Sequence, residues 1–150
     1  IIPVQLMGWD WFLYQQLIDH RRGPEEGVFN QSYVRTYDFY NPDRPVFFVY
    51  ISDQDLTGTA PYEVVDSARQ VKAGVFLVEQ RYTGSSFPTH ELSTETLKEL
   101  LTIEQMVDDV ASFGASLQAK ADNVKIILFG CSRTGMIAAV ARQRYPKVFA

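Results

Sequence analysis

The stretch that decides the fold is residues 126–139, which reads IILFGCSRTGMIAA. An apolar strand signal leads directly into a small-residue turn and then into an Ala-rich helix signal. This context predicts a sharp strand-to-helix turn that lifts the hydroxyl of Ser132 clear of a sheet. It makes Ser132 a candidate nucleophile, with the backbone N–H of Arg133 as a candidate oxyanion donor at a helix N-terminus. The alternative is that Ser132 only caps the helix.

Strand and helix signals alternate on the N-terminal side of this turn. Apolar runs at residues 46–51, 75–78 and 124–129, the last interrupted by Lys125, are typical of strands buried on both faces, and they predict neighbouring parallel strands. Residues 28–40 are rich in β-branched and aromatic side chains, which indicates a further strand. Apolar residues at helical spacing predict three helices, over residues 62–72, 102–119 and 136–145. The fold class is therefore α/β, a mainly parallel sheet with flanking helices.

The second of these helices has a start signal of its own. Thr102 and Gln105 are spaced as a capping box, in which each side chain bonds the backbone N–H of the other residue.

Composition limits the classes of function. The chain of 150 residues is 46% hydrophobic and 21% charged, with a formal net charge of −4. The Lys and Arg residues do not form a cluster, so the sequence does not predict nucleic-acid binding. The chain also contains no apolar run of the roughly 18 residues that a membrane span requires. The single cysteine, Cys131, permits no internal disulfide, and we expect no metal or organic cofactor because no ligand spacing is present. Asn30 begins an Asn-Gln-Ser sequon and is a candidate glycosylation site.

Five segments resemble, in order, the family of lysosomal Pro-Xaa carboxypeptidase, dipeptidyl peptidase II and thymus-specific serine peptidase. They are YQQLIDH at 14–20, PVFFVYI at 45–51, VEQRYTGSSFP at 78–88, LTIEQ at 101–105 and RYP at 144–146. The third is the most specific, because it is close to the Glu-His-Arg-Tyr-Tyr-Gly-x-Ser-x-Pro block of the family. The turn at Ser132 falls between the last two segments.

The resemblance implies that residues 1–150 are the N-terminal part of one α/β-hydrolase domain that cleaves peptides next to proline. Ser132 would attack the carbonyl, and an Asp and a His following residue 150 would complete the triad, since that is their order in this fold. His20 is then expected to be structural and His90 solvated. The resemblance also implies a secreted or lysosomal/vacuolar location and a peptide substrate. The remainder of the polypeptide, or another chain, is expected to cover the sheet edge beside the turn.

Three departures from the family favour an alternative, a catalytically weak or inactive relative that serves binding or structure. The family has Gly-Gly-Glu-Gly where this chain has residues 52–55, Ser-Asp-Gln-Asp, so two carboxylates either oppose an oxyanion or turn to solvent. Gln80 stands in place of a His. At the turn itself, Cys131, Arg133 and Thr134 are unusual, and a β-branched Thr134 predicts relaxed geometry there. Other hydrolase chemistry, such as ester hydrolysis, also stays open because fold does not fix function.

Overall fold

The computed structural model describes residues 3–5 (backbone), 8–56 and 59–150. Its strands are β1 (Pro3–Gln5), β2 (Asp10–Leu17), β3 (Val28–Thr36), β4 (Val46–Ser52), β5 (Thr59–Pro61), β6 (Gly74–Glu79) and β7 (Lys125–Phe129). Its helices are α1 (Tyr62–Val71), α2 (Thr94–Leu100), α3 (Ile103–Gln118) and α4 (Arg133–Arg144), with a short 3₁₀ turn at Pro24–Glu26.

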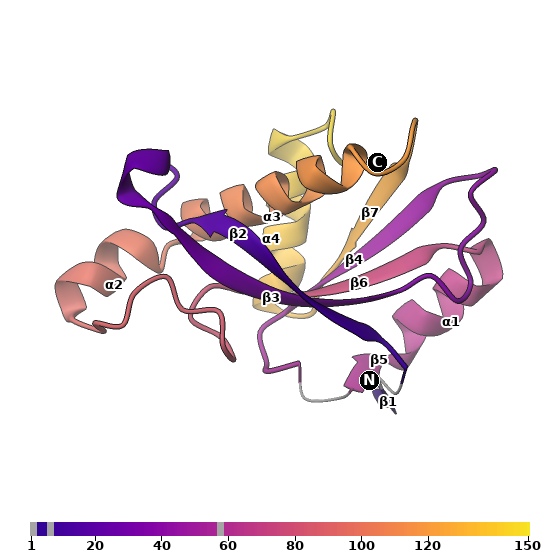
Figure 1. Cartoon of the computed structure of the whole chain (residues 1–150), viewed down its shortest axis with the longest axis horizontal. Helices are drawn as coiled ribbons and strands as arrows, with labels where there is room; N and C mark the ends of the chain where they lie inside the picture. Colours follow the sequence, from indigo (N-terminus) through magenta and orange to yellow (C-terminus); the bar gives the residue numbers. More distant parts are fainter. Residues whose placement is uncertain (1–2, 6–7, 57–58) are drawn as a thin grey trace.

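One sheet organises the molecule, in the strand order β2-β3-β6-β4-β7 (Figure 1). β4 pairs in parallel with β6 on one side and with β7 on the other, which confirms the predicted parallel strands. β2 and β3 extend the sheet as an antiparallel hairpin, and β3 pairs antiparallel with β6, so the sheet as a whole is mixed. β1 and β5 form a separate antiparallel ribbon.

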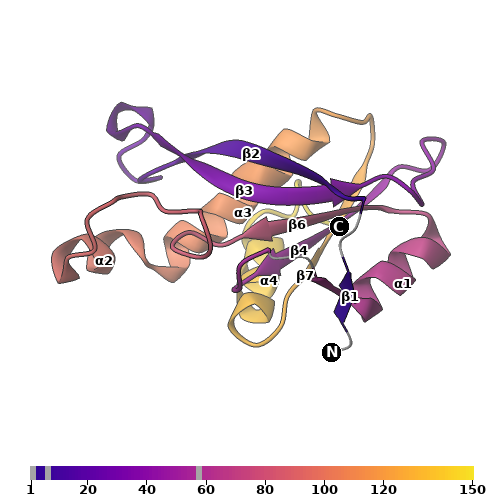
Figure 2. The ribbon, with the colours of Figure 1, turned by 60° about the horizontal axis from the view of Figure 1, so that its bottom comes forward.

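Alternate residues of the central strands fill two cores on opposite faces of the sheet. On one face, Val49, Ile51 and Phe76 pack against α3 and α4. On the other face, Phe48 and Val75 belong to the core that α1 covers. In Figure 2, β2 and β3 pass in front of α3, which lies against one face of the sheet. The apolar runs are unbroken because helices cover both faces of β4 and β6.

The helices follow the predicted spacing, with shifted ends. α1 stops at Val71 because Lys72 adopts a left-handed φ of 59°, and α4 begins three residues before the predicted 136. At the start of α3, the Thr102 hydroxyl accepts the N–H of Gln105 at 3.2 Å. The reciprocal half of the predicted capping box is wrong, because the Gln105 side chain bonds Asp19 and the backbone of His20 instead.

Among the described residues, no helix is both long enough and apolar enough to cross a membrane. The carboxyl ends of the parallel strands β6, β4 and β7 all face the same edge of the sheet, because parallel strands run in one direction. This edge is where ligands bind in open α/β sheets, and it positions the site.

Candidate active site

Ser132 occupies the sharp turn between β7 and α4. Its backbone has φ 55° and ψ −119°, a conformation that residues with a Cβ rarely adopt. Its side chain is exposed and makes no capping hydrogen bond to α4. The predicted strained strand-to-helix turn is therefore confirmed. The Ser132 hydroxyl is not used in the cap that the alternative interpretation assigned to it.

The turn is held closed by Thr134, which is fully buried. Its hydroxyl accepts the N–H of Cys131 at 2.8 Å and donates to the carbonyl of the same residue at 2.9 Å. Gly130 is required because a Cβ there would lie 2.3 Å from the backbone of Thr134. The expectation that Thr134 relaxes the turn is wrong: its γ-hydroxyl closes the turn and supports the strained Ser132.

Two backbone N–H groups, one on α4 next to Ser132 in sequence and one in the loop after β4, are candidates to donate to a developing negative charge. The N–H of Arg133, at the first position of α4, makes no hydrogen bond within the part of the chain that the structure describes. In the loop after β4, the N–H of Gln54 is bonded to Ser52 Oγ at 3.2 Å. The N–H of Asp53 makes none to any described residue. These two free donors come from the elements that supply the oxyanion hole in α/β hydrolases.

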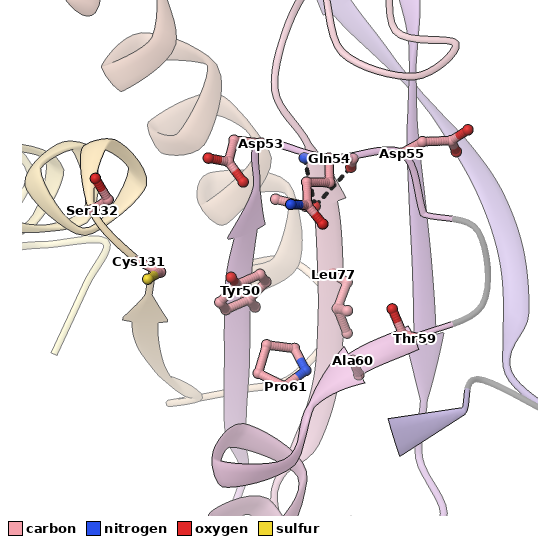
Figure 3. A pocket seen from close by; sticks show the side chains of 11 residues that line it. Tyr50, Asp53, Gln54, Asp55, Thr59, Ala60, Pro61, Leu77, Cys131 and Ser132 are labelled. Atoms are coloured by element: carbon pink, nitrogen blue, oxygen red, sulfur yellow. Dashed lines mark hydrogen bonds between the residues drawn. The ribbon is translucent and has the colours of Figure 1, made fainter. Parts of the chain in front are cut away.

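A cavity of about 460 Å³ opens beside Ser132 (Figure 3). It is lined by residues of β4, β5 and β6, the loop after β4 and the turn after β7: Tyr50, Ser52, Asp53, Gln54, Asp55, Thr59, Ala60, Pro61, Leu77, Cys131 and Ser132. We call it the Ser132 cavity. Nothing in the sequence marked the β5 wall as part of a site, since Thr59–Pro61 belongs to none of the matching segments.

The two carboxylates of the loop after β4 take different directions. Both aspartates are exposed, and the carboxylate of Asp53 points toward the side of Ser132, whereas that of Asp55 points away from it (Figure 3). Burial raises the pKa of the Tyr50 hydroxyl, and the nearby Cys131 and Asp53 raise it further. The loop thus brings one negative charge to the cavity on the Ser132 side.

Neither histidine lines the Ser132 cavity. His20 is mostly buried, and its Nε2 lies 2.7 Å from Asp109 Oδ1, which confirms its structural role. His90 is exposed, as predicted. Gln80 is buried, and neither its amide nitrogen nor its amide oxygen has a hydrogen-bond partner among the described residues. Because His20 does not line the Ser132 cavity, the His20–Asp109 pair cannot act as a general base for Ser132 in this arrangement.

The glycosylation candidate lies on β3. Asn30 is exposed and its side chain bonds that of Gln15 on the neighbouring strand. The hydroxyl of Ser32, the third sequon residue, is bonded to Ser85 Oγ at 2.7 Å in a mostly buried position.

Comparison with known proteins matches the chain to one peptidase family. The family described as serine carboxypeptidase S28 matches residues 16–150. The chain is 31% identical over 147 residues to a probable serine protease, EDA2, of Arabidopsis thaliana, covering 91% of this chain and 29% of that protein. It is 27% identical over 157 residues to the human lysosomal Pro-X carboxypeptidase, covering 97% of this chain and 31% of that protein. The chain therefore spans under a third of the length of these relatives.

Solved structures agree on the fold. A protein of Pseudomonas aeruginosa PAO1 described as a probable hydrolytic enzyme superimposes with a TM-score of 0.63 at 12% identity, over 95% of this chain and 39% of that chain. An α/β serine hydrolase without a lid, from Xanthomonas campestris, superimposes with a TM-score of 0.52 at 15% identity, over 98% of this chain and 60% of that chain. The architecture is thus part of an α/β-hydrolase fold. With a family match that covers most of its length, the chain belongs to the serine carboxypeptidase S28 family.

Proposed function

We propose that the whole protein containing this chain is a serine exopeptidase that hydrolyses peptide bonds next to proline. Residues 1–150 would be the N-terminal part of its single α/β-hydrolase domain. The observation that carries the proposal is the exposed Ser132 hydroxyl, held at positive φ between β7 and α4 and facing a cavity. The name of the human relative supports the preference for proline.

In this reaction Ser132 Oγ attacks the substrate carbonyl and forms a tetrahedral intermediate. The N–H groups of Arg133 and Asp53 would donate to its oxyanion, which is the largest single contribution in many acyl-transfer enzymes. A His, oriented by an Asp, would take the proton from Ser132 and later give it to the leaving amine. Both would come from parts of the protein outside residues 1–150.

The proposal also covers what lies against the edge of β7 and where inside or outside the cell the protein is found. The outer side of β7 has no neighbouring strand among the described residues, although the Ala150 N–H bonds the carbonyl of Ile126, and a largely unpaired edge of this kind is prone to association. We expect further strands of the same domain, or another chain, to cover it. The lysosomal relative supports a secreted or lysosomal/vacuolar location, and Asn30 would then be open to glycosylation.

The test is active-site labelling of the whole protein with a fluorophosphonate, which reacts with activated serine hydroxyls. We expect one labelled peptide, containing Ser132, and loss of labelling in Ser132→Ala. The matched control Ser67→Ala, in α1 and away from the Ser132 cavity, should label like the wild type. Peptides with an internal or penultimate proline, offered with free and blocked termini, then identify which terminus is recognised.

Failure has a clear form in this experiment. If folded wild-type protein is not labelled and cleaves none of these peptides, the peptidase proposal is wrong. The chain would then belong to an inactive relative in which the Asp53 carboxylate opposes charge at Ser132.

A further inference from the structure

The carboxylate of Glu79 is buried at the end of β6 and has no cationic partner within the described residues. Glu79 is only 1% exposed. Burying a carboxylate is costly unless hydrogen-bond donors surround it. The hydrogen-bond donors around the Glu79 carboxylate therefore indicate which parts of the structure it holds in place.

Three donors from two loops converge on this carboxylate. Oε2 accepts the hydroxyl of Ser86 at 2.6 Å and the N–H of Ser85 at 3.2 Å, both from the loop after β6. Oε1 accepts the N–H of Leu56 at 3.3 Å, from the loop after β4. Gly84, at φ 56°, passes so close that a Cβ there would lie 2.2 Å from Glu79 Oε1. The loop after β6 is shaped around the carboxylate.

The bond from the Leu56 N–H to Glu79 matters because the residues just before Leu56 line the Ser132 cavity. Residues 53–55 form the part of the Ser132 cavity wall that contains the free N–H of Asp53. At its near end this segment is anchored by Ser52, whose carbonyl accepts the N–H of Gln80 at 3.0 Å and whose hydroxyl bonds Gln54. At its far end the anchor is Leu56, buried and bonded to Glu79. Glu79 thus fixes one of the two ends of a short exposed segment next to Ser132.

We propose that Glu79 is a positioning residue for the reaction at Ser132: through Leu56 it holds the loop after β4 so that the Asp53 N–H can donate to the oxyanion. The proposal rests on the proposed function. An oxyanion donor acts in the transition state, so its misplacement lowers kcat and leaves KM little changed. If Glu79 had only a structural role, its substitution would lower stability without selectively lowering kcat relative to KM.

The experiment compares three variants of the whole protein. Glu79→Ala removes the Leu56 anchor and the bonds to Ser85 and Ser86, and we expect kcat and the fluorophosphonate labelling rate to fall about 10- to 100-fold, with KM within about three-fold of wild type. Glu79→Gln loses the bond from the Ser85 N–H, because an amide nitrogen cannot accept it. It should still retain most activity, because its amide oxygen accepts the Leu56 N–H while Ser86 Oγ accepts from the amide nitrogen. Ser86→Ala, the matched control, removes a bond to the same carboxylate but leaves the Leu56 anchor, and should keep kcat.

Amide hydrogen exchange gives a readout that needs no activity. Leu56 should exchange faster in Glu79→Ala than in wild type or Ser86→Ala, while α3 and α4 keep their protection. If Glu79→Ala does not fold, Glu79→Leu, which fills the space without accepting a hydrogen bond, carries the same expectations. If neither folds, or if a folded variant keeps wild-type kcat and Leu56 protection, the proposal is wrong. Absence of labelling in the wild type would instead reject the peptidase, and the exchange data would still decide whether Glu79 anchors the loop.

Discussion

Arg81 and Asp109 form a buried, two-pronged ion pair: Arg81 Nε lies 2.7 Å from Asp109 Oδ2, and Arg81 Nη2 lies 2.7 Å from Asp109 Oδ1. The remaining guanidinium donors of Arg81 bond the carbonyls of Leu17, Ile18 and Leu100. The pair ties the end of β6 to α3 and to the chain that leaves β2.

We expect Asp109→Asn to destabilise the whole protein by about 3–5 kcal/mol, because it leaves the charge of Arg81 buried without its partner. Arg22→Ala removes the ion pairs that the exposed guanidinium of Arg22 makes with Asp19, Glu26 and Glu99, and it should cost under about 1 kcal/mol. Urea unfolding measures both. Equal, small losses in the two variants would show that the buried pair adds nothing.

Asp19 predicts an acid-dependent part of stability. Burial acts to raise the pKa of its carboxyl, but hydrogen bonds from Arg21 and Gln105 outweigh burial and hold that pKa well below its usual range. A carboxyl with a depressed folded pKa stabilises the protein above its unfolded pKa, about 4, and the contribution disappears as pH falls through the folded value. Asp19→Asn should therefore lower Tm most above about pH 5, and its difference from wild type should narrow toward pH 2. Asp43→Asn, at an exposed position, serves as the control. If the difference in Tm between Asp19→Asn and wild type widened as the pH falls, the lowered pKa of Asp19 would be contradicted.

Thr134 offers a test of the turn. Thr134→Val removes the hydroxyl that bonds both backbone groups of Cys131 and leaves the Cys131 N–H unpaired, at a cost of about 1–3 kcal/mol. The Cys131 carbonyl still accepts the backbone N–H of Thr134. We expect a matching loss of stability and slower labelling of Ser132, because its strained φ is no longer supported. Thr134→Ser keeps the hydroxyl and should behave like the wild type. A fully active Thr134→Val would show that the backbone alone maintains the turn.

Neutralising Asp53 should speed the chemistry. Its carboxylate points toward the side of Ser132, where negative charge develops during acyl transfer. We expect Asp53→Asn to raise kcat a few-fold and to lower the pKa of Tyr50, which this carboxylate helps to raise. Asp55→Asn, on the same loop but pointing away, is the matched control and should leave kcat unchanged. A fall in kcat in Asp53→Asn would mean that the carboxylate binds a positive group of the substrate.

Residues 1–150 expressed alone should show no Ser132-dependent turnover of proline-containing peptides. A serine that lacks its general base loses most of its catalytic advantage, on the order of 10⁶ in rate. Assay of the purified, monomeric piece beside its Ser132→Ala variant checks this. Turnover that disappears with Ser132→Ala would place the base within residues 1–150.

The parallel core was predictable because its signal is local. Strands buried on both faces need consecutive apolar residues, and β4 and β6 consist almost entirely of such residues. β2 gave no equivalent signal: apolar residues fill both of its faces near Trp11, and polar Gln15 and Gln16 follow. α2, with the sequence TETLKEL, buries only Leu100 and so has no apolar stripe to recognise.

The site was predictable at Ser132 and not around it. Small residues between an apolar strand and a helix mark the turn in the sequence itself. The hydroxyl of Thr134, by contrast, acquires its role only when β7 and α4 pass close together. Similarly, His20 bonds Asp109 and Glu79 bonds Leu56, and no spacing rule in the sequence reaches either of these partners. Side chains whose partners are non-local have to be seen in three dimensions.

The order of strands in the sheet differs from their order along the chain, and this bears on how the protein folds. β4 lies between β6 and β7, and its Val46 pairs with Lys125, so β4 gains its second neighbour only after most of the described chain has been made. Pairing over such separations slows folding, because the loop between the partners must close before the contact forms. We therefore expect the bend at Ser132 to be among the last features acquired. Substitutions there should accelerate unfolding and leave the refolding rate almost unchanged.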